Sequence, residues 1–235
     1  MTTGEPARPR RSRALRNEHL RLGAVFAPAP ADEAVLHYDR PELEPGHIAD
    51  LALVDLTFAP RWGIKGPDAP IALRATGLEC PPASNRCVSS PGGATVAALS
   101  ATEYIAVWDR AVPDSREPEL RRALTGTAQE CYFVDHFEGM FCFAITGARR
   151  EQLYRGCCAV DLSDRASPAG HVVQTRLHHT GVVILRRATG TLALDLILGD
   201  ISMATYTWHN LSACLAEAGG SIAGIGALHG HPSGY

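Results

Sequence analysis

The alternation of apolar and polar residues predicts short strands interspersed with helices. Leucine recurs at every second position from Leu192 to Leu198, which is typical of a strand with one buried face. Residues 171–187 predict a second long strand, and Ala188-Thr189-Gly190 predicts the turn between the two. Residues 203–218 instead predict a helix, capped by Asp200 or Ser202 and ended by Gly219. We therefore expect an α+β fold.

A faint internal repeat organises the middle of the chain. Residues 51–77 and 131–156 both contain two strand-like segments, then a glycine, and then a short helix that ends near another glycine. The helix glycines Gly66 and Gly147 correspond, and so do the aspartates Asp55 and Asp135. We predict that these aspartates occupy equivalent places in two similar halves, about residues 14–128 and 129–218.

The two ends are expected to lie outside this core. Residues 1–13 combine arginines with prolines, which is typical of a disordered basic arm, and residues 28–32 are typical of an irregular connector. A weak helical pattern lies between them, with Gly23 as its cap. Residues 219–235 form a glycine-rich tail, in which His229-Gly230-His231 has a metal-like spacing. Because such a tail has no reason to be rigid, we predict no metal site and no core contacts there.

Composition narrows the classes of function. With 235 residues, of which 46% are hydrophobic, the chain is long enough to bury roughly 70% of its unfolded surface. The formal net charge of -3 is that of a protein that does not bind nucleic acid by bulk charge. No apolar run approaches the ~20 residues that span a bilayer. The seven cysteines, none of them in a C-x-x-C spacing, favour reduced thiols. We expect a cytoplasmic protein that binds neither nucleic acid nor a membrane.

Three stretches, taken in order, resemble one superfamily. Residues 15–38 and 54–73 resemble the opening and the signature strand of glycine-cleavage T-proteins. Residues 157–187 resemble the second half of the γ subunit of heterotetrameric sarcosine oxidases. The chain is therefore similar to the aminomethyltransferase-like superfamily. The resemblance implies an aminomethyltransferase folate-binding-like fold, residues 14–218, that lacks the C-terminal barrel domain of T-proteins.

The resemblance also implies one-carbon chemistry. Members of the superfamily pass a methylene group from an aminomethyl or iminium carrier to tetrahydrofolate, and in T-proteins an Asn and a Gly-Gly pair lead into an Asp that orients amine and folate. Asn85, Gly92 and Gly93 match these cofactor-binding positions, but residues 94–97 carry no carboxylate. That carboxylate would act as a general base and stabilise an iminium ion. Its absence argues against ordinary folate-dependent transfer, and the γ subunit lacks it too.

Without a folate nitrogen, a thiolate is the natural protein acceptor for an imine carbon. Cys87 is the leading candidate, because it follows Asn85 among polar residues that we interpret as an exposed loop. The adjacent Cys157-Cys158 pair follows a helix end, and by alternation one of the two faces inward; Cys158 is the second catalytic candidate. Cys131 and Cys142 lie in aromatic strand sequence and are predicted to pack in the core.

Two histidines are candidates for proton transfer to or from an amine, because imidazole titrates near neutrality. His178 is interpreted as a strand residue whose ring points to the face opposite that of His179. His136 lies beside the repeated Asp135.

Two functions remain open. In the first, the protein is an enzyme that transfers a one-carbon or imine-level group, of the methylene or iminomethyl type, from a small amine to an amino acceptor, and works with a flavin-dependent amine oxidase. In the second, it is a non-catalytic γ-like subunit of a sarcosine-oxidase-type flavoprotein complex. The missing carboxylate favours the subunit, whereas the T-protein-like opening and the additional cysteines favour the enzyme. From the sequence alone we favour the enzyme.

Overall fold

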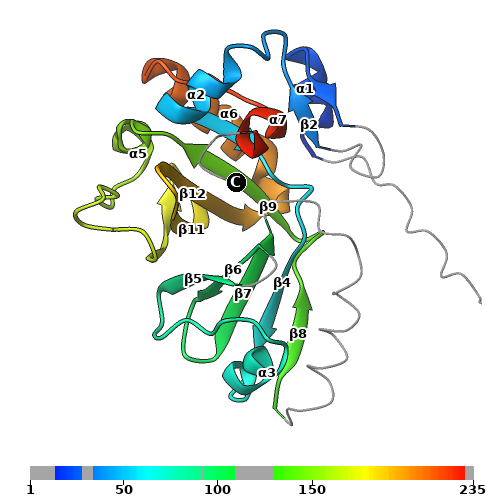
Figure 1. Ribbon diagram of the computed structural model, residues 1–235, viewed down its shortest axis with the longest axis vertical. Helices are drawn as coiled ribbons and strands as arrows, with labels where there is room; N and C mark the ends of the chain where they lie inside the picture. Colours follow the sequence, from blue (N-terminus) through cyan, green and yellow to red (C-terminus); the bar gives the residue numbers. More distant parts are fainter. Residues whose placement is uncertain (1–13, 28–33, 91–92, 109–129, 231–235) are drawn as a thin grey trace, which may run out of the picture.

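Two β-sheets stacked on one another form the body of the molecule (Figure 1). The structure, a computed structural model, describes residues 14–27, 34–90, 93–108 and 130–230. The predicted arm, residues 1–13, and the connector, residues 28–32, lie outside the described residues, as does Gly92. In Figure 1 the six-stranded sheet occupies the upper half and the five-stranded sheet the lower half.

Both sheets have the same strand arrangement: three strands that are consecutive in the chain lie at one edge, and strands from elsewhere in the chain follow them. The six-stranded sheet has the order β10 (Val172–Leu177), β11 (Thr180–Thr189), β12 (Leu192–Asp200), β9 (Met140–Thr146), β3 (Ala52–Asp55), β13 (Ser221–Ile222). The five-stranded sheet has the order β5 (Arg86–Ser90), β6 (Ala94–Ala98), β7 (Glu103–Trp108), β4 (Arg61–Lys65), β8 (Tyr132–Asp135). A small sheet pairs β1 (Val25–Phe26) with β2 (Val35–His37).

Helices cover the outer faces of both sheets. On the five-stranded sheet lies α3 (Ala69–Ala75), and on the six-stranded sheet lie α5 (Arg150–Cys157) and α6 (Ala204–Glu217). Three further helices of the described residues, at the top of Figure 1, are α1 (Arg16–Arg21), α2 (Glu44–Asp50) and α7 (Ile225–His229), and a short 3-10 helix, η1 (Ile201–Met203), precedes α6. The Leu192–Leu198 alternation places its leucines in the core between the two sheets, as predicted.

The internal repeat is confirmed by the topology. The first copy folds as β3, β4 and α3, and the second copy folds as β8, β9 and α5. Each copy is followed by three antiparallel strands, β5 to β7 or β10 to β12, that extend one sheet. The first strand of each copy pairs with the second strand of the other, β3 with β9 and β8 with β4. Each copy therefore contributes strands to both sheets.

Asp55 and Asp135, which correspond in the two copies, also make the same local hydrogen bond. Asp55 Oδ1 accepts a hydrogen bond from the Thr57 amide at 2.8 Å, and Asp135 Oδ1 accepts one from the Phe137 amide at 3.0 Å. Both bonds form the tight turn that ends the first strand of a copy. The two aspartates are thus equivalent, as predicted. Asp55 Oδ2 also lies 2.8 Å from Nε2 of the buried His19.

Residues 171–187 do not form the single strand that the pattern predicted. The segment is a hairpin in which Leu177 pairs with Thr180 across a two-residue turn made by His178 and His179. His178 adopts the left-handed backbone conformation, with φ at 50°. No glycine, proline or asparagine marks this turn in the sequence, which is why the alternation alone missed it.

The tail is also not the loose segment that its glycines predicted. Strand β13 adds to β3 in parallel, and Ala223, Ile225 and Leu228 are buried in the same hydrophobic cluster as the leucines of β12. The glycines serve close approach, because a Cβ on Gly224 would lie 2.3 Å from the Leu36 carbonyl oxygen. The predicted absence of core contacts is therefore wrong for residues 219–230.

Candidate functional site

Cys87 lies inside the protein and not on an exposed loop. It belongs to β5, its side chain is 6% exposed, and its thiol lies within hydrogen-bonding distance of the carbonyl oxygens of His171 and Arg186, at 3.7 and 3.6 Å. Burial raises the pKa of the Cys87 thiol to about 11, although the nearby Arg187 lowers it. Polar neighbours misled the prediction of exposure, because alternate residues of a strand point to opposite faces. At neutral pH this group is a thiol, which is a poor nucleophile.

The predicted cofactor-binding residues hold strands together. Asn85 adopts a left-handed backbone, with φ at 58°, and its side-chain oxygen accepts a hydrogen bond from Gln174 Nε2 at 2.9 Å. Its backbone carbonyl accepts a hydrogen bond from the Val172 amide, so that Asn85 joins β10 of one sheet to the start of β5 in the other. Gly93, with φ at 80°, stands just before β6.

His136 follows β8, and its ring lies across the strand β4. A Cβ on Gly63 would stand 2.6 Å from His136 Nε2, so that the glycine makes room for the imidazole. Within the described part of the chain, this nitrogen is buried and has no hydrogen-bond partner. Burial lowers the pKa of His136, and the positive charge of Lys65 lowers it further. The ring is therefore neutral at neutral pH.

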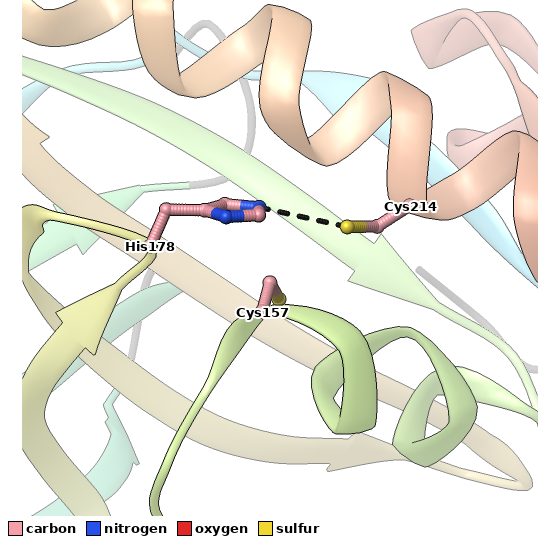
Figure 2. Close-up of side chains that lie close together, drawn as sticks. All are labelled: Cys157, His178 and Cys214. Atoms are coloured by element: carbon pink, nitrogen blue, oxygen red, sulfur yellow. Dashed lines mark hydrogen bonds between the residues drawn. The ribbon is translucent and has the colours of Figure 1, made fainter.

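Three other groups meet beneath helices α5 and α6: Cys157, His178 and Cys214 (Figure 2). Cys157 is the last residue of α5, His178 begins the turn between β10 and β11, and Cys214 lies in α6. The two thiol sulfurs and one ring nitrogen lie within 4.8 Å of one another, and Cys214 Sγ is 3.5 Å from His178 Nε2. In the described ranges, no other group of three His, Cys, Asp or Glu side chains lies this close together.

Backbone contacts fix two of these residues relative to each other. The His178 amide donates a hydrogen bond to the Cys157 carbonyl at 2.8 Å, and Cys158 bridges to Leu177 beside it. Cys157 points inward and is 7% exposed, whereas Cys158 is only half-buried, with its sulfur 3.9 Å from Thr175 Oγ1. Of the adjacent pair, the inward-facing member is thus Cys157, and it is Cys157, not the predicted candidate Cys158, that meets His178.

A cavity of about 720 Å³ opens beside this group. Cys157 and His178 both line it, together with residues of β10, β11 and β12 and with Met140. Burial raises the pKa of Cys157 to about 12 and also raises the pKa of Cys214. The group therefore holds two protonated thiols and an imidazole, and of its three members Cys157 and His178 line the cavity.

Comparison with known proteins shows that the chain has a known fold. No protein-family model matches the chain, and no curated protein matches its sequence. The chain is similar to a chain of the heterotetrameric sarcosine oxidase from Corynebacterium sp. U-96 in complex with pyrrole 2-carboxylate, with a TM-score of 0.62 and 19% identity over 76% of this chain and 92% of that one. It is also similar to the glycine cleavage system aminomethyltransferase T from Bartonella henselae, with a TM-score of 0.73 and 17% identity over 91% of this chain and 59% of that one.

The chain has the aminomethyltransferase-like fold. At these identities it is the fold that is shared. The chain spans almost the whole length of the sarcosine oxidase chain but only 59% of the length of the aminomethyltransferase. Within the described residues, no helix of this aminomethyltransferase-like chain is long and apolar enough to cross a membrane.

A buried charge network anchors α5 in the aminomethyltransferase-like fold. Arg186 of β11 and Asp195 of β12 are both fully buried and form a hydrogen-bonded ion pair at 2.8 Å. Arg150, at the start of α5, lies 3.3 Å from the same aspartate, and Asp164 accepts from both arginines. Because buried charges require partners, this network fixes the position of α5 and hence of Cys157.

Sequence reasoning named His178 but missed Cys157 and Cys214. Cys214 lies three residues after Leu211 on the buried face of α6, where a thiol usually packs as a small apolar group. The available clue was the Cys157-Cys158 pair, in which alternation requires one thiol to face inward.

Proposed function

We propose that the chain is the small, γ-like subunit of a flavin-dependent amine-oxidising complex, and that it has no transferase activity of its own. The observation that carries this proposal is the burial of Cys87. The resemblance places this residue on the loop that approaches the one-carbon site in T-proteins, and it is a buried, protonated thiol within hydrogen-bonding distance of two backbone carbonyls. The neighbouring strand β6 is buried along its length and carries no carboxylate.

The structural similarity supports the same proposal. The match covers 92% of one chain of a heterotetrameric sarcosine oxidase. The partner would be a flavoprotein subunit, as the sequence resemblance implies. A surface for it exists at the N-terminal segment, where Leu20, Leu22 and Val25 expose large apolar side chains close together in the sequence. Exposed apolar clusters of this kind are typical of protein–protein contacts.

The test is reconstitution. The chain is co-expressed with the other subunits of a heterotetrameric amine oxidase from which the small subunit has been left out. We then measure flavin absorbance, co-elution of the chain with those subunits, and amine-dependent oxygen consumption. We expect co-elution and restored oxidation. The variant Leu22→Glu/Val25→Glu should lose co-elution, whereas Ile71→Glu, exposed on α3 at the other end of the molecule, should retain it. A chain that never co-elutes, or two variants that behave alike, would contradict the proposal.

A second candidate is the transfer of a one-carbon or imine-level group to an amino acceptor. It is favoured by the fold match to the aminomethyltransferase over 91% of this chain, and by the thiol and imidazole that Cys157 and His178 present to the cavity. The Cys157 thiol would add across the C=N bond of the donor imine, with its proton passing to the nitrogen. The donor amine would then leave, an acceptor amine would take its place on the carbon, and departure of the thiol would release the imine of the acceptor. Tetrahydrofolate is the natural first acceptor to try, with Asn85 and Gly93 as its predicted contacts.

This candidate is tested on the purified chain alone. An amine-derived imine is supplied with tetrahydrofolate or with an acceptor amine, and product and protein mass are followed. Transfer that Cys157→Ala or His178→Asn abolishes would replace the subunit proposal, and Cys87→Ala, Cys158→Ala and His136→Asn would show whether the residues predicted from the sequence take part. No product and no mass adduct with any acceptor would eliminate the transferase.

A further inference from the structure

The grouping of Cys157, His178 and Cys214 offers a donor set with a narrow chemical meaning. Two sulfurs and one imidazole nitrogen, with no carboxylate among them, are the ligands preferred by borderline and soft metal ions such as Zn²⁺. Calcium and magnesium require oxygen ligands and do not fit this set. The three residues come from three separate segments, so that their meeting is a property of the tertiary fold and not of a local motif.

The spacing between one sulfur and the ring nitrogen matches tetrahedral zinc. Zn–S and Zn–N bonds of about 2.3 and 2.0 Å, at tetrahedral angles, place a sulfur about 3.6 Å from a nitrogen and two sulfurs about 3.8 Å apart. The observed distance from Cys214 Sγ to His178 Nε2 is 3.5 Å, and all three donor atoms lie within 4.8 Å of one another. Figure 2 shows the imidazole directed at Cys214, with Cys157 beside them.

The surroundings hold the ligands in place. The hydrogen bond from the His178 amide to the Cys157 carbonyl ties two ligands together through the backbone. The left-handed backbone of His178 is uncommon for a residue of this size, and it turns the ring toward the two sulfurs. Cys157 and Cys214 are both buried on the helix-covered side of the sheet. Ligands held in advance in this way lose little freedom when an ion binds.

The charges balance when the ion replaces protons. Cys157 and Cys214 carry their protons in the metal-free chain, and the titratable groups that act on them are Cys158 and Glu217. Binding of a divalent ion releases both thiol protons and forms two metal–thiolate bonds, so that the positive charge of two on the ion is neutralised by two thiolates. His178 binds through its neutral Nε2, which requires the ring proton on Nδ1.

We propose that Cys157, His178 and Cys214 bind one zinc-class ion, whose fourth coordination position faces the cavity of about 720 Å³. Three protein ligands and one accessible position are typical of a zinc site that accepts water or a small nitrogen, oxygen or sulfur ligand. A closed structural site would have a fourth protein ligand. This inference does not rest on the subunit proposal, since it concerns the chain by itself.

The test uses the full chain, treated first with a chelator and a thiol reductant and then titrated anaerobically with Co²⁺ or with Zn²⁺ against a chromogenic chelator. We expect one ion per chain, thiolate-to-cobalt charge-transfer absorption in the near ultraviolet, and the intense visible bands of tetrahedral cobalt. Cys157→Ser, Cys214→Ser and His178→Asn should each weaken zinc binding by at least about 100-fold, because even residues behind the ligands contribute up to that much. Asn is chosen because it tolerates the left-handed backbone of His178.

Two matched variants serve as controls. Cys158→Ser and His179→Asn each change the neighbour of a ligand and should bind zinc as the wild type does. Circular dichroism of the metal-free variants identifies any that fail to fold, and the proposal is then judged on the variants that remain folded. Binding that survives the loss of Cys157 and Cys214, or no binding to a reduced wild-type chain, overturns the site. A Cys157–Cys214 disulfide that forms without any metal affinity overturns it as well.

Discussion

The docked tail makes a prediction opposite to the one that its composition suggests. Leu228 of α7 is completely buried in the hydrophobic cluster that also holds the leucines of β12, and the same short segment buries Ala223 and Ile225. Leu228→Ala removes three buried carbons where α7 packs on β2 and α2. A fully buried leucine that becomes alanine costs about 2–5 kcal/mol, counting both the lost transfer energy and the cavity. For a chain of this size, that corresponds to a fall in Tm of roughly 4–20 °C.

The assay is urea unfolding followed by tryptophan fluorescence, because all three tryptophans are buried and report on the folded state. The midpoint should fall in Leu228→Ala without a change in slope, which would show lost stability and not a changed unfolded state. Ile71→Ala is the matched control: its side chain is 56% exposed, and its stability should stay within about 0.5 kcal/mol of the wild type. If Leu228→Ala behaves like Ile71→Ala, then α7 does not dock in solution, and the first expectation for the tail was correct.

Three further predictions follow from buried groups. Asp195→Leu should cost about 3–5 kcal/mol because the buried Arg186 and Arg150 lose their buried partner and keep only the partly exposed Asp164, while Arg186→Met/Asp195→Leu should recover part of that loss in urea unfolding; equal stability of the single variant and the wild type would mean that the pair does not form. Burial would raise the pKa of Asp55, but the hydrogen bond and charge of His19 outweigh it and hold this pKa below its ordinary value. The ionised Asp55 therefore stabilises the folded state fully above about pH 4, and this stabilisation is lost as the pH falls through the lowered pKa. The variant Asp55→Asn should have a lower free energy of unfolding than the wild type at neutral pH, and that free energy should depend less on pH in acid. Parallel curves of unfolding free energy against pH for the two proteins would refute this. Cys87→Ala should cost about 1–2 kcal/mol by leaving a small cavity, and a change below about 0.5 kcal/mol would restore its assignment to an exposed loop.

Local patterns in the sequence predicted much of the fold. The Leu192–Leu198 alternation, the helix around Trp208 and the repeated Asp55 and Asp135 all became the elements that were expected. Each of these depends on residues within a few positions of one another, which is the range over which periodicity and capping act. The order of the three stretches that resemble T-proteins and the γ subunit predicted the aminomethyltransferase-like fold, and the structural comparison confirmed this prediction.

What the sequence left hidden depended on partners that are distant along the chain. Taken alone, the glycines of the tail indicate flexibility. In the fold, however, a glycine is required at position 224 because the Leu36 backbone lies against it. The prediction that Cys87 is exposed failed because exposure depends on the sheet that covers the strand. Cys157 and Cys214 are separated by the three strands β10, β11 and β12, so that no spacing rule brings them together.

The exchange of strands between the two copies has a consequence for how such a chain could arise. Because β3 completes the sheet of the second copy and β8 completes the sheet of the first, neither copy can satisfy its backbone hydrogen bonds alone. The pairing is self-complementary, because each copy adds its first strand to the second strand of the other copy. That is the geometry of a two-fold symmetric dimer, here contained within one polypeptide. A single ancestral unit would therefore have been stable only as a pair, and fusion of two units would have freed each half to diverge.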